Sequence, residues 1–99
     1  IFLIGNGGSA GNAIHIANDF IYGARDSIGV GYKIHALPSN PSILTCIGND
    51  VGYDSIFSIQ LKSLASAGDI LLALSGSGNS ENIIKAINTA PAKVILVMT

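Results

Sequence analysis

Charged residues are scarce in this sequence of 99 residues: Lys, Arg, Asp and Glu make up 11% of it, and the formal net charge is −1. A nucleic-acid-binding face needs a concentration of basic side chains, whereas the five basic residues here are scattered along the chain. No apolar run approaches the roughly 20 residues that a membrane-spanning helix requires. The composition therefore argues against direct nucleic-acid binding and against a membrane protein.

Cysteine is nearly absent, because Cys46 is the only one. A single cysteine excludes an internal disulfide bond and favours a reducing compartment, so we expect a cytoplasmic protein. Within "SILTCIG", Cys46 is predicted to be a small buried apolar side chain. The three tyrosines, Tyr22, Tyr32 and Tyr53, are too widely spaced to indicate a stacking platform.

Apolar residues, by contrast, make up 48% of the chain and gather in short runs. The predicted strands are "IFLI" at 1–4, "YKIHAL" at 32–37, "DILLAL" at 69–74 and "KVILVM" at 93–98. Such short runs, rich in Ile, Leu and Val, are typical of strands buried on both faces of a parallel sheet.

Segments with helical spacing separate these strands, at 9–24, 41–48, 54–65 and 81–90. Alternating strands and helices predict an α/β domain with a parallel sheet and right-handed crossovers. We expect residues 1–99 to form one domain. Because the chain starts at Ile1 within a predicted strand and ends within another, we also expect it to be a segment of a longer protein.

The first predicted strand is followed by "GNGGSAGNA". Glycines allow close backbone approach here, and the amides that start the next helix attract an anion. The loop is not a Walker A motif, because no Gly-Lys-Ser/Thr follows, and Ala10 occupies the place of the third glycine in GxGxxG. Taken alone, an ordinary glycine-rich turn explains this loop equally well.

The strand at 69–74 is followed by "SGSGNS" at 75–80. Ser75, Ser77 and Ser80 supply three hydroxyls, and Ser80 is a good helix N-cap. Hydroxyls and amides at a helix N-terminus can hold a phosphate without a lysine, although a simple capping turn is the alternative. Because ligands bind beyond the carboxyl ends of parallel strands, the two loops together favour a phosphate or phosphosugar site.

Two further polar groups are candidate functional residues. His15 and Asp19 lie four residues apart, on one face of a predicted helix, where they could share a metal ion or move a proton. A solvent-exposed polar pair is the simpler explanation of that spacing. Asn49 and Asp50 are predicted to form a structural loop, or else to meet sugar hydroxyls. His35, inside a strand, is predicted to be structural.

The stretches "GNGGSA", "HIAND", "SILTCIGNDVGYDSIF" and "GDILLALSGSGNS" resemble the sugar isomerase (SIS) domain superfamily, and within it the phosphoheptose isomerases. The resemblance covers essentially the whole chain. It implies a three-layer sandwich with a mostly parallel sheet, of which residues 1–99 are an incomplete core. It also implies a homotetramer that converts sedoheptulose 7-phosphate to D-glycero-D-manno-heptose 7-phosphate through an enediol. A non-catalytic phosphosugar-binding regulator, or a replication-initiation partner, is the alternative that other SIS proteins suggest.

The resemblance also implies roles for individual residues. Substrate would be bound by Asn6, Gly7, Gly8, Ser9, Asn49 and Asp50, with its phosphate cradled by Ser75, Gly76, Ser77 and Ser80. His15 would be a zinc ligand, and Asp19, where the family has Glu, would be both a ligand and the catalytic base. The family's remaining ligands and its general acid, a Gln and a His, would lie beyond Thr99.

Overall fold

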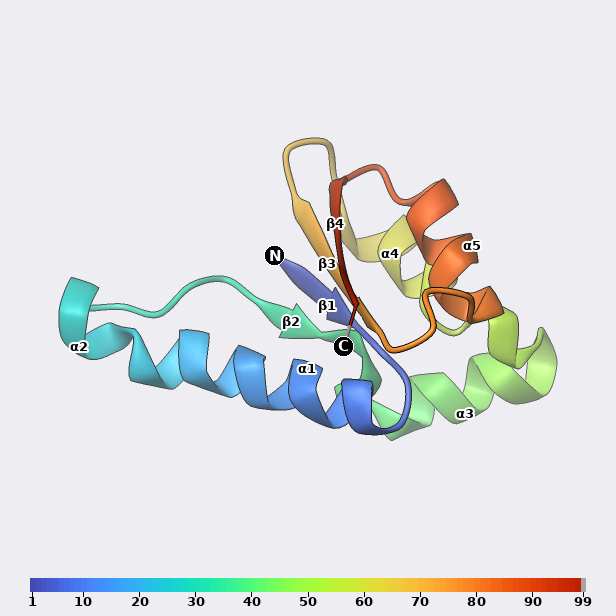
Figure 1. The fold of residues 1–99 in the computed structure, drawn as a ribbon, viewed down its shortest axis with the longest axis horizontal. Coiled ribbons are helices and arrows are strands. Elements are labelled where there is room, and N and C mark those ends of the chain that lie inside the picture. The colour runs from blue at the N-terminus through green and yellow to red at the C-terminus, as the bar shows by residue number, and fades with distance from the viewer. Residues whose placement is uncertain (99) are drawn as a thin grey trace.

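The computed structural model describes residues 1–98 and contains a four-stranded parallel sheet with the strand order β2-β1-β3-β4 (Figure 1). The strands are β1 (Phe2–Ile4), β2 (His35–Ala36), β3 (Ile70–Ser75) and β4 (Lys93–Met98). The α-helices are α1 (Gly8–Asn18), α2 (Arg25–Ile28), α3 (Pro41–Asp50), α4 (Ser58–Leu64) and α5 (Glu81–Thr89). The prediction of an α/β fold with a parallel sheet is confirmed.

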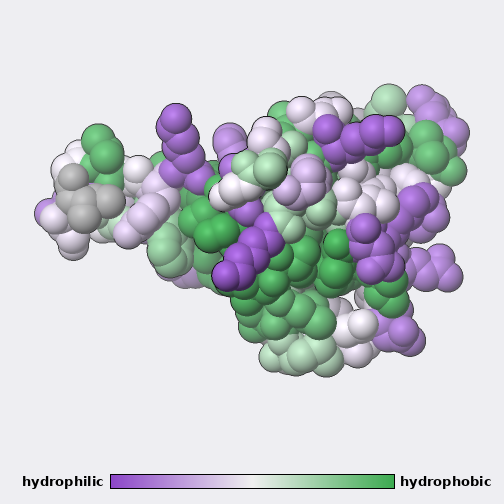
Figure 2. All heavy atoms as spheres, turned by 90° about the horizontal axis from the view of Figure 1, so that it is seen from above, coloured by the Kyte–Doolittle hydropathy of each residue, from purple (hydrophilic) through white to green (hydrophobic). Residues whose placement is uncertain are grey.

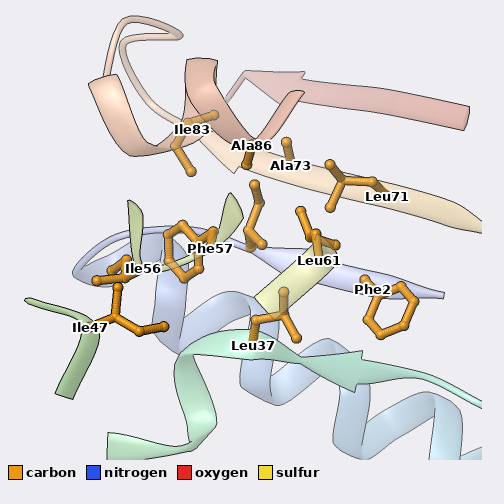
Figure 3. Packing of buried hydrophobic residues seen from close by; sticks show 11 residues of the cluster. Phe2, Leu37, Ile47, Ile56, Phe57, Leu61, Leu71, Ala73, Ile83 and Ala86 are labelled. Carbon is orange, nitrogen blue, oxygen red and sulfur yellow. The ribbon is translucent and has the colours of Figure 1, made fainter. Parts of the chain in front are cut away.

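Side chains of the central strands alternate between two hydrophobic cores, as the pleat of a strand requires. On one face, Phe2 and Leu71 pack with Phe57, with Leu61 of α4 and with Ile83 of α5 (Figure 3). This larger core extends to Ile4, Leu37, Ile47, Ile56, Ala73 and Ala86. It is covered by α3, α4 and α5.

The opposite face of the sheet packs against α1. Leu3 and Leu74 point to this side, where they meet Ala13 and Ala17 of the helix. The small alanine side chains allow the helix to lie close to the strands. The sheet is therefore the middle of three layers, which confirms the predicted sandwich.

The connections of β1 and β3 diverge although the two strands are neighbours. From β1 the chain runs through α1, on one face, to β2; from β3 it runs through α5, on the other face, to β4. Adjacent strands whose following helices lie on opposite faces define a topological switch point, where the loops part and leave a crevice. This arrangement places the "GNGGSA" and "SGSGNS" loops on either side of one opening.

Strand β4 is less buried than predicted. Ile95, Leu96 and Met98 are exposed to 45%, 45% and 58%, because β4 lies at the edge of the sheet and pairs only with β3 in the described chain. Strand β2, at the other edge, is two residues long rather than six. In the view of Figure 2, hydrophobic side chains gather toward the lower part of the molecule, whereas the outer right-hand edge is mostly hydrophilic.

The helix predicted at 9–24 is longer and less regular than expected. After α1 the chain continues as a π-helical turn at Asp19–Gly23 and then as α2, which together project away from the sheet (Figure 1). The irregular segment that leads back to β2 is held to this projection at Tyr32. Its N–H donates to the Phe20 carbonyl at 3.1 Å, and the two rings make an edge-to-face contact.

The prediction that Cys46 is buried is wrong. Helix α3 turns Ile47 inward, with Ile43 and Leu44 partly buried beside it, so Cys46 falls on the exposed side. Its Sγ lies 3.6 Å from Asp50 Oδ2.

The predicted helix at 54–65 consists of a 3-10 turn at Tyr53–Ser55 followed by α4, which ends at Leu64. No helix within residues 1–98 is long and apolar enough to cross a membrane.

Candidate functional site

A cavity of about 200 Å³ lies at the carboxyl ends of β1 and β3, at the topological switch point. We call it the cradle cavity. It is lined by Asn6, Ser9, Leu74, Ser75, Gly76, Ser77 and Ser80. The structure thus brings together the two loops that the sequence singled out. Every lining residue is uncharged, so the cavity can offer an anion only hydroxyls and amides.

The "SGSGNS" loop is held by its own serine side chains. The Gly78 N–H donates to Ser75 Oγ at 2.9 Å, and the Asn79 N–H donates to Ser77 Oγ at 3.1 Å. A hydroxyl that accepts such a bond still has its own proton to donate. Ser75 and Ser77 therefore brace the loop as acceptors and remain donors for a ligand.

Ser80 occupies the N-cap position of α5, as predicted, but its side chain makes no capping hydrogen bond. The first backbone bond of this helix runs from the Ile84 N–H to the Ser80 carbonyl at 3.0 Å. The earlier amides of the first turn have no partner within the helix and carry the positive end of its dipole. Next to the cradle cavity, these amides and the Ser80 hydroxyl favour a bound anion.

The "GNGGSA" loop turns sharply into α1. A Cβ on Gly5 would lie 2.7 Å from the Ser9 carbonyl oxygen, so only glycine fits there. The Ser9 N–H donates to the Asn6 carbonyl at 2.9 Å, which places both residues at the cavity wall. Gly7 and Gly8 are exposed and do not line this cavity.

Asn6 is tied to two residues that the sequence reasoning did not select. Its Nδ2 donates to Asn82 Oδ1 at 2.8 Å, and Asn82 Nδ2 donates back to Asn6 Oδ1 at 2.9 Å. The Tyr53 hydroxyl donates to the same Asn6 oxygen at 3.1 Å. One signal was present in the sequence: Asn82 lies next to Ile83 and four residues before Ala86, on the buried side of α5.

A second cavity of about 440 Å³ shares Asn6 and Ser80 with the cradle cavity. It is further lined by Tyr53, Asp54, Glu81 and Asn82. A ligand longer than a phosphate could therefore extend from one cavity past Asn6 into the other. The residues that line this second cavity have polar side chains, among them two carboxylates and a phenol, which suit sugar hydroxyls.

Asn49 and Asp50 do not lie in a loop, so the prediction that they form a structural loop is wrong. They form the last turn of α3, where Asn49 Nδ2 donates to Asp50 Oδ1 at 3.0 Å. Both side chains are exposed and line neither cavity, so the described residues do not bring them to the cradle. Tyr53 and Asp54, from the same "GNDVGYD" stretch, occupy the second cavity instead.

His15 and Asp19 lie on one face of the helix, with His15 Nε2 3.3 Å from Asp19 Oδ2. Their side chains are 76% and 59% exposed, and neither lines the two cavities. An imidazole nitrogen and a carboxylate oxygen this close can ligate one zinc ion, but a zinc site needs at least a third protein ligand. Within residues 1–98 no group of three or more His, Cys, Asp or Glu side chains is placed to hold a metal.

His35 lies outside both cavities. Its ring stacks on Phe2 with the centroids 5.6 Å apart, at one edge of the sheet. It also borders a further cavity of about 440 Å³ beside α1 that is lined largely by apolar side chains, among them Ile14, Ile21 and Leu64. Apart from His35 itself, none of the histidine and carboxylate candidates reaches that cavity.

Comparison with known proteins links the chain and its fold to one family. A family described as "SIS domain" matches residues 1–98. The phosphoheptose isomerase of Pectobacterium atrosepticum is 48% identical over 95 residues, which cover 96% of this chain and 48% of that protein. Thus the chain spans about half the length of the curated relatives it matches.

Solved structures agree with the sequence comparison. A phosphoheptose isomerase from Francisella tularensis superposes with a TM-score of 0.90 at 31% identity, covering 98% of this chain and 52% of that one. The phosphoheptose isomerase from Neisseria gonorrhoeae gives a TM-score of 0.80 at 38% identity, covering 96% of this chain and 50% of that one.

Proposed function

The chain belongs to the SIS domain family, and from that premise we propose that the whole protein is a phosphosugar aldose–ketose isomerase. Its proposed reaction converts sedoheptulose 7-phosphate to D-glycero-D-manno-heptose 7-phosphate. The observation that carries this proposal is the cradle cavity at the switch point between β1 and β3. The phosphoheptose isomerases to which the chain is similar supply the choice of sugar.

The proposed role of the cradle is to hold the phosphate at one end of the sugar. Ser75, Ser77 and Ser80 would donate hydroxyl protons to its oxygens, and the first amides of α5 would add the positive end of the helix dipole. Binding energy gained at this distant group would orient the carbonyl end for reaction. The second cavity, which shares a wall with the cradle, would receive the hydroxylated chain.

Isomerisation requires proton transfer between neighbouring carbons. We assign the base to Asp19: its carboxylate would take the proton from the carbon next to the carbonyl, giving an enediol, and return it to the adjacent carbon. As the enediol forms, the old carbonyl oxygen gains a proton, and the hydroxyl on the neighbouring carbon loses one when it becomes the new carbonyl. One C–H and one O–H proton therefore change place, and the product is an isomer of the substrate. His15, 3.3 Å from Asp19 Oδ2, would hold this carboxylate in place.

His15 and Asp19 fit a zinc ion as two of its ligands, and we propose that they bind one together with groups outside residues 1–98. Zinc would supply a Lewis acid for the substrate carbonyl. We further propose a cytoplasmic homotetramer. The exposed Phe20, Ile21 and Tyr22 on the projecting helix support an assembly in which such side chains are covered.

A second candidate function is phosphosugar binding without catalysis, as in a regulator. The exposure of His15 and Asp19, away from both cavities, favours it, because the cradle cavity lies within this chain while the proposed reacting groups do not line it. The two functions share the cradle and differ only in turnover.

Incubation of the whole protein with sedoheptulose 7-phosphate separates them. We expect the aldose phosphate to form, detected by ¹H NMR of the new anomeric proton. In deuterium oxide, an enediol route with exchange at the base would place deuterium on the carbon that regains the proton. Binding of the ketose phosphate without any aldose product would favour the regulator, and absence of binding would contradict both functions.

A further inference from the structure

Asn82 is an almost completely buried polar side chain, 2% exposed, in the first turn of α5. It lies behind the cradle rather than in its wall, since the cradle cavity is lined by Asn6 and Ser80 but not by Asn82. Its two hydrogen bonds to Asn6 join residues 76 positions apart in the sequence. They therefore connect the β1 loop directly to the start of α5, which are the two sides of the cradle.

These bonds also decide what Asn6 can offer a ligand. An amide oxygen has two lone pairs, and those of Asn6 are taken by Asn82 Nδ2 and by the Tyr53 hydroxyl. An amide nitrogen has two protons, and one is donated to Asn82 Oδ1. What remains on the Asn6 side chain is one N–H donor and no acceptor.

We propose that Asn82 is a positioning residue that makes Asn6 a committed hydrogen-bond donor at the cradle, with Tyr53 supporting it from the turn after α3. This inference rests on the proposed function, since the donor would serve an oxygen of the bound phosphosugar. An amide free to rotate presents either its oxygen or its nitrogen, whereas a clamped amide presents a single group. The cradle wall carries no charged side chain that would select one orientation of this amide, so its orientation depends on the bonds to Asn82 and Tyr53.

Replacing Tyr53 perturbs the hydrogen bonds that Asn6 makes with Asn82 and Tyr53, which we call the clamp, and it does so with little effect on the fold. The Tyr53 side chain is 64% exposed, so replacing it with Phe removes the hydroxyl without opening the core. Its turn is also fixed independently, because Lys85 Nζ bonds Ser55 Oγ at 2.8 Å and pairs with Asp54 Oδ2 at 3.3 Å. Loss of the hydroxyl should therefore affect Asn6 and not the turn.

A double-mutant cycle on the whole protein tests the proposal, with sedoheptulose 7-phosphate and inorganic phosphate as probes in calorimetry. Asn82→Ala should weaken binding of the phosphosugar about tenfold, and Tyr53→Phe about threefold. In an Asn6→Ala background both changes should have less than about a twofold effect, because their influence passes through Asn6. Asn88→Ala, on the exposed side of α5, and Tyr32→Phe, which lines neither cavity, are matched controls that should leave affinity unchanged.

Equal effects in both backgrounds would overturn the positioning role, because Asn82 would then act on the ligand directly from the second cavity, which it lines. Wild-type affinity in both variants would overturn it as well.

The ¹⁵N-edited NMR spectrum of the ligand-free protein tests the hydrogen bonds of Asn6 independently of the proposed function. Asn82→Ala and Tyr53→Phe should shift the Asn6 side-chain amide resonances, and Asn88→Ala should not. If the wild-type protein bound neither probe, the proposed function would fail, while these shifts would still support the clamp. An Asn6 side-chain amide unmoved by both variants would overturn it.

Discussion

The Ser75 hydroxyl accepts a hydrogen bond from the Gly78 backbone N–H at 2.9 Å, at the point where β3 ends. The Ser75 side chain is buried, and Gly78 has the positive φ of 65° that the turn requires. One bond thus closes the loop and leaves the serine proton for another acceptor. The conformation of the loop and its capacity to bind an anion depend on the same two residues.

Ser77→Ala should weaken phosphosugar binding by about 2 kcal/mol, or about 30-fold in Kd, because a hydrogen bond to a charged phosphate is lost. The exposed Ser77 contributes little to the core, so the melting temperature should change little. Calorimetry with sedoheptulose 7-phosphate measures the affinity. Ser63→Ala on α4 is the matched control. Equal phosphosugar affinity of the two variants would show that Ser77 does not bind the phosphate.

Asp19→Asn should lower turnover about a thousandfold, since the amide cannot accept the transferred proton, while phosphosugar affinity is retained. Asp19→Glu should keep turnover, because the carboxylate is preserved. Asp26→Asn, on the neighbouring helix α2, is the control. Turnover of the Asp19→Asn variant at the wild-type rate would rule out Asp19 as the base.

Gly78→Ala should lower the free energy of unfolding by about 1–2 kcal/mol, because Gly78 has a positive φ. A Cβ there would also lie 2.9 Å from Met98 Sδ. The loop would shift, so phosphosugar affinity should fall with it. Gly48→Ala is the contrast: this glycine is helical and its Cβ would meet no atom within 4 Å, so urea unfolding should show a gain of up to about 1 kcal/mol. Equal loss of stability in both variants would contradict this explanation.

Removal of metal should abolish turnover without abolishing binding of the phosphosugar, because the proposed zinc ligands lie outside the cradle cavity. Dialysis of the whole protein against a chelator, followed by zinc addition, should remove and restore activity. His15→Ala should weaken zinc binding in calorimetry, whereas His35→Gln should not, since His35 stacks on Phe2 at the sheet edge. Full activity after exhaustive chelation would exclude a zinc enzyme.

Salt should have little effect on phosphosugar affinity, because every residue lining the cradle cavity is neutral. We expect less than about a threefold change in Kd between about 0.05 M and 0.5 M sodium chloride. A steep loss of affinity with salt would show that cationic side chains from outside residues 1–98 take part in holding the phosphate.

Much of the fold follows from local sequence patterns. The runs at 1–4 and 69–74 are apolar without interruption, apart from Asp69, and they form β1 and β3, the buried centre of the sheet. Within residues 1–98 the similarly apolar run at 93–98 pairs only with β3 and is exposed, and composition does not record how many neighbours a strand has. The prediction for Cys46 was wrong for a related reason. Neighbouring residues of a helix point in different directions, so Ile47 is buried while Cys46, one position earlier in α3, is exposed.

The candidate site was predictable where it depends on loops that follow strands. Ser75, Ser77 and Asn6 meet in one cavity because parallel strands end at a common edge. Asn82 could not be selected in this way, because its role depends on hydrogen bonds to Asn6, which is 76 residues away in the sequence. Asn49 and Asp50 remain predicted substrate contacts by family resemblance, although the described residues place them outside both cavities.

The location of the phosphate tests the central claim most directly. A crystal structure of the whole protein with sedoheptulose 7-phosphate should show the phosphate in the cradle cavity, with its oxygens within hydrogen-bond distance of the Ser75, Ser77 and Ser80 hydroxyls. The sugar chain should extend past Asn6 toward the second cavity. A phosphate bound elsewhere, with the cradle cavity containing only water, would contradict the claim.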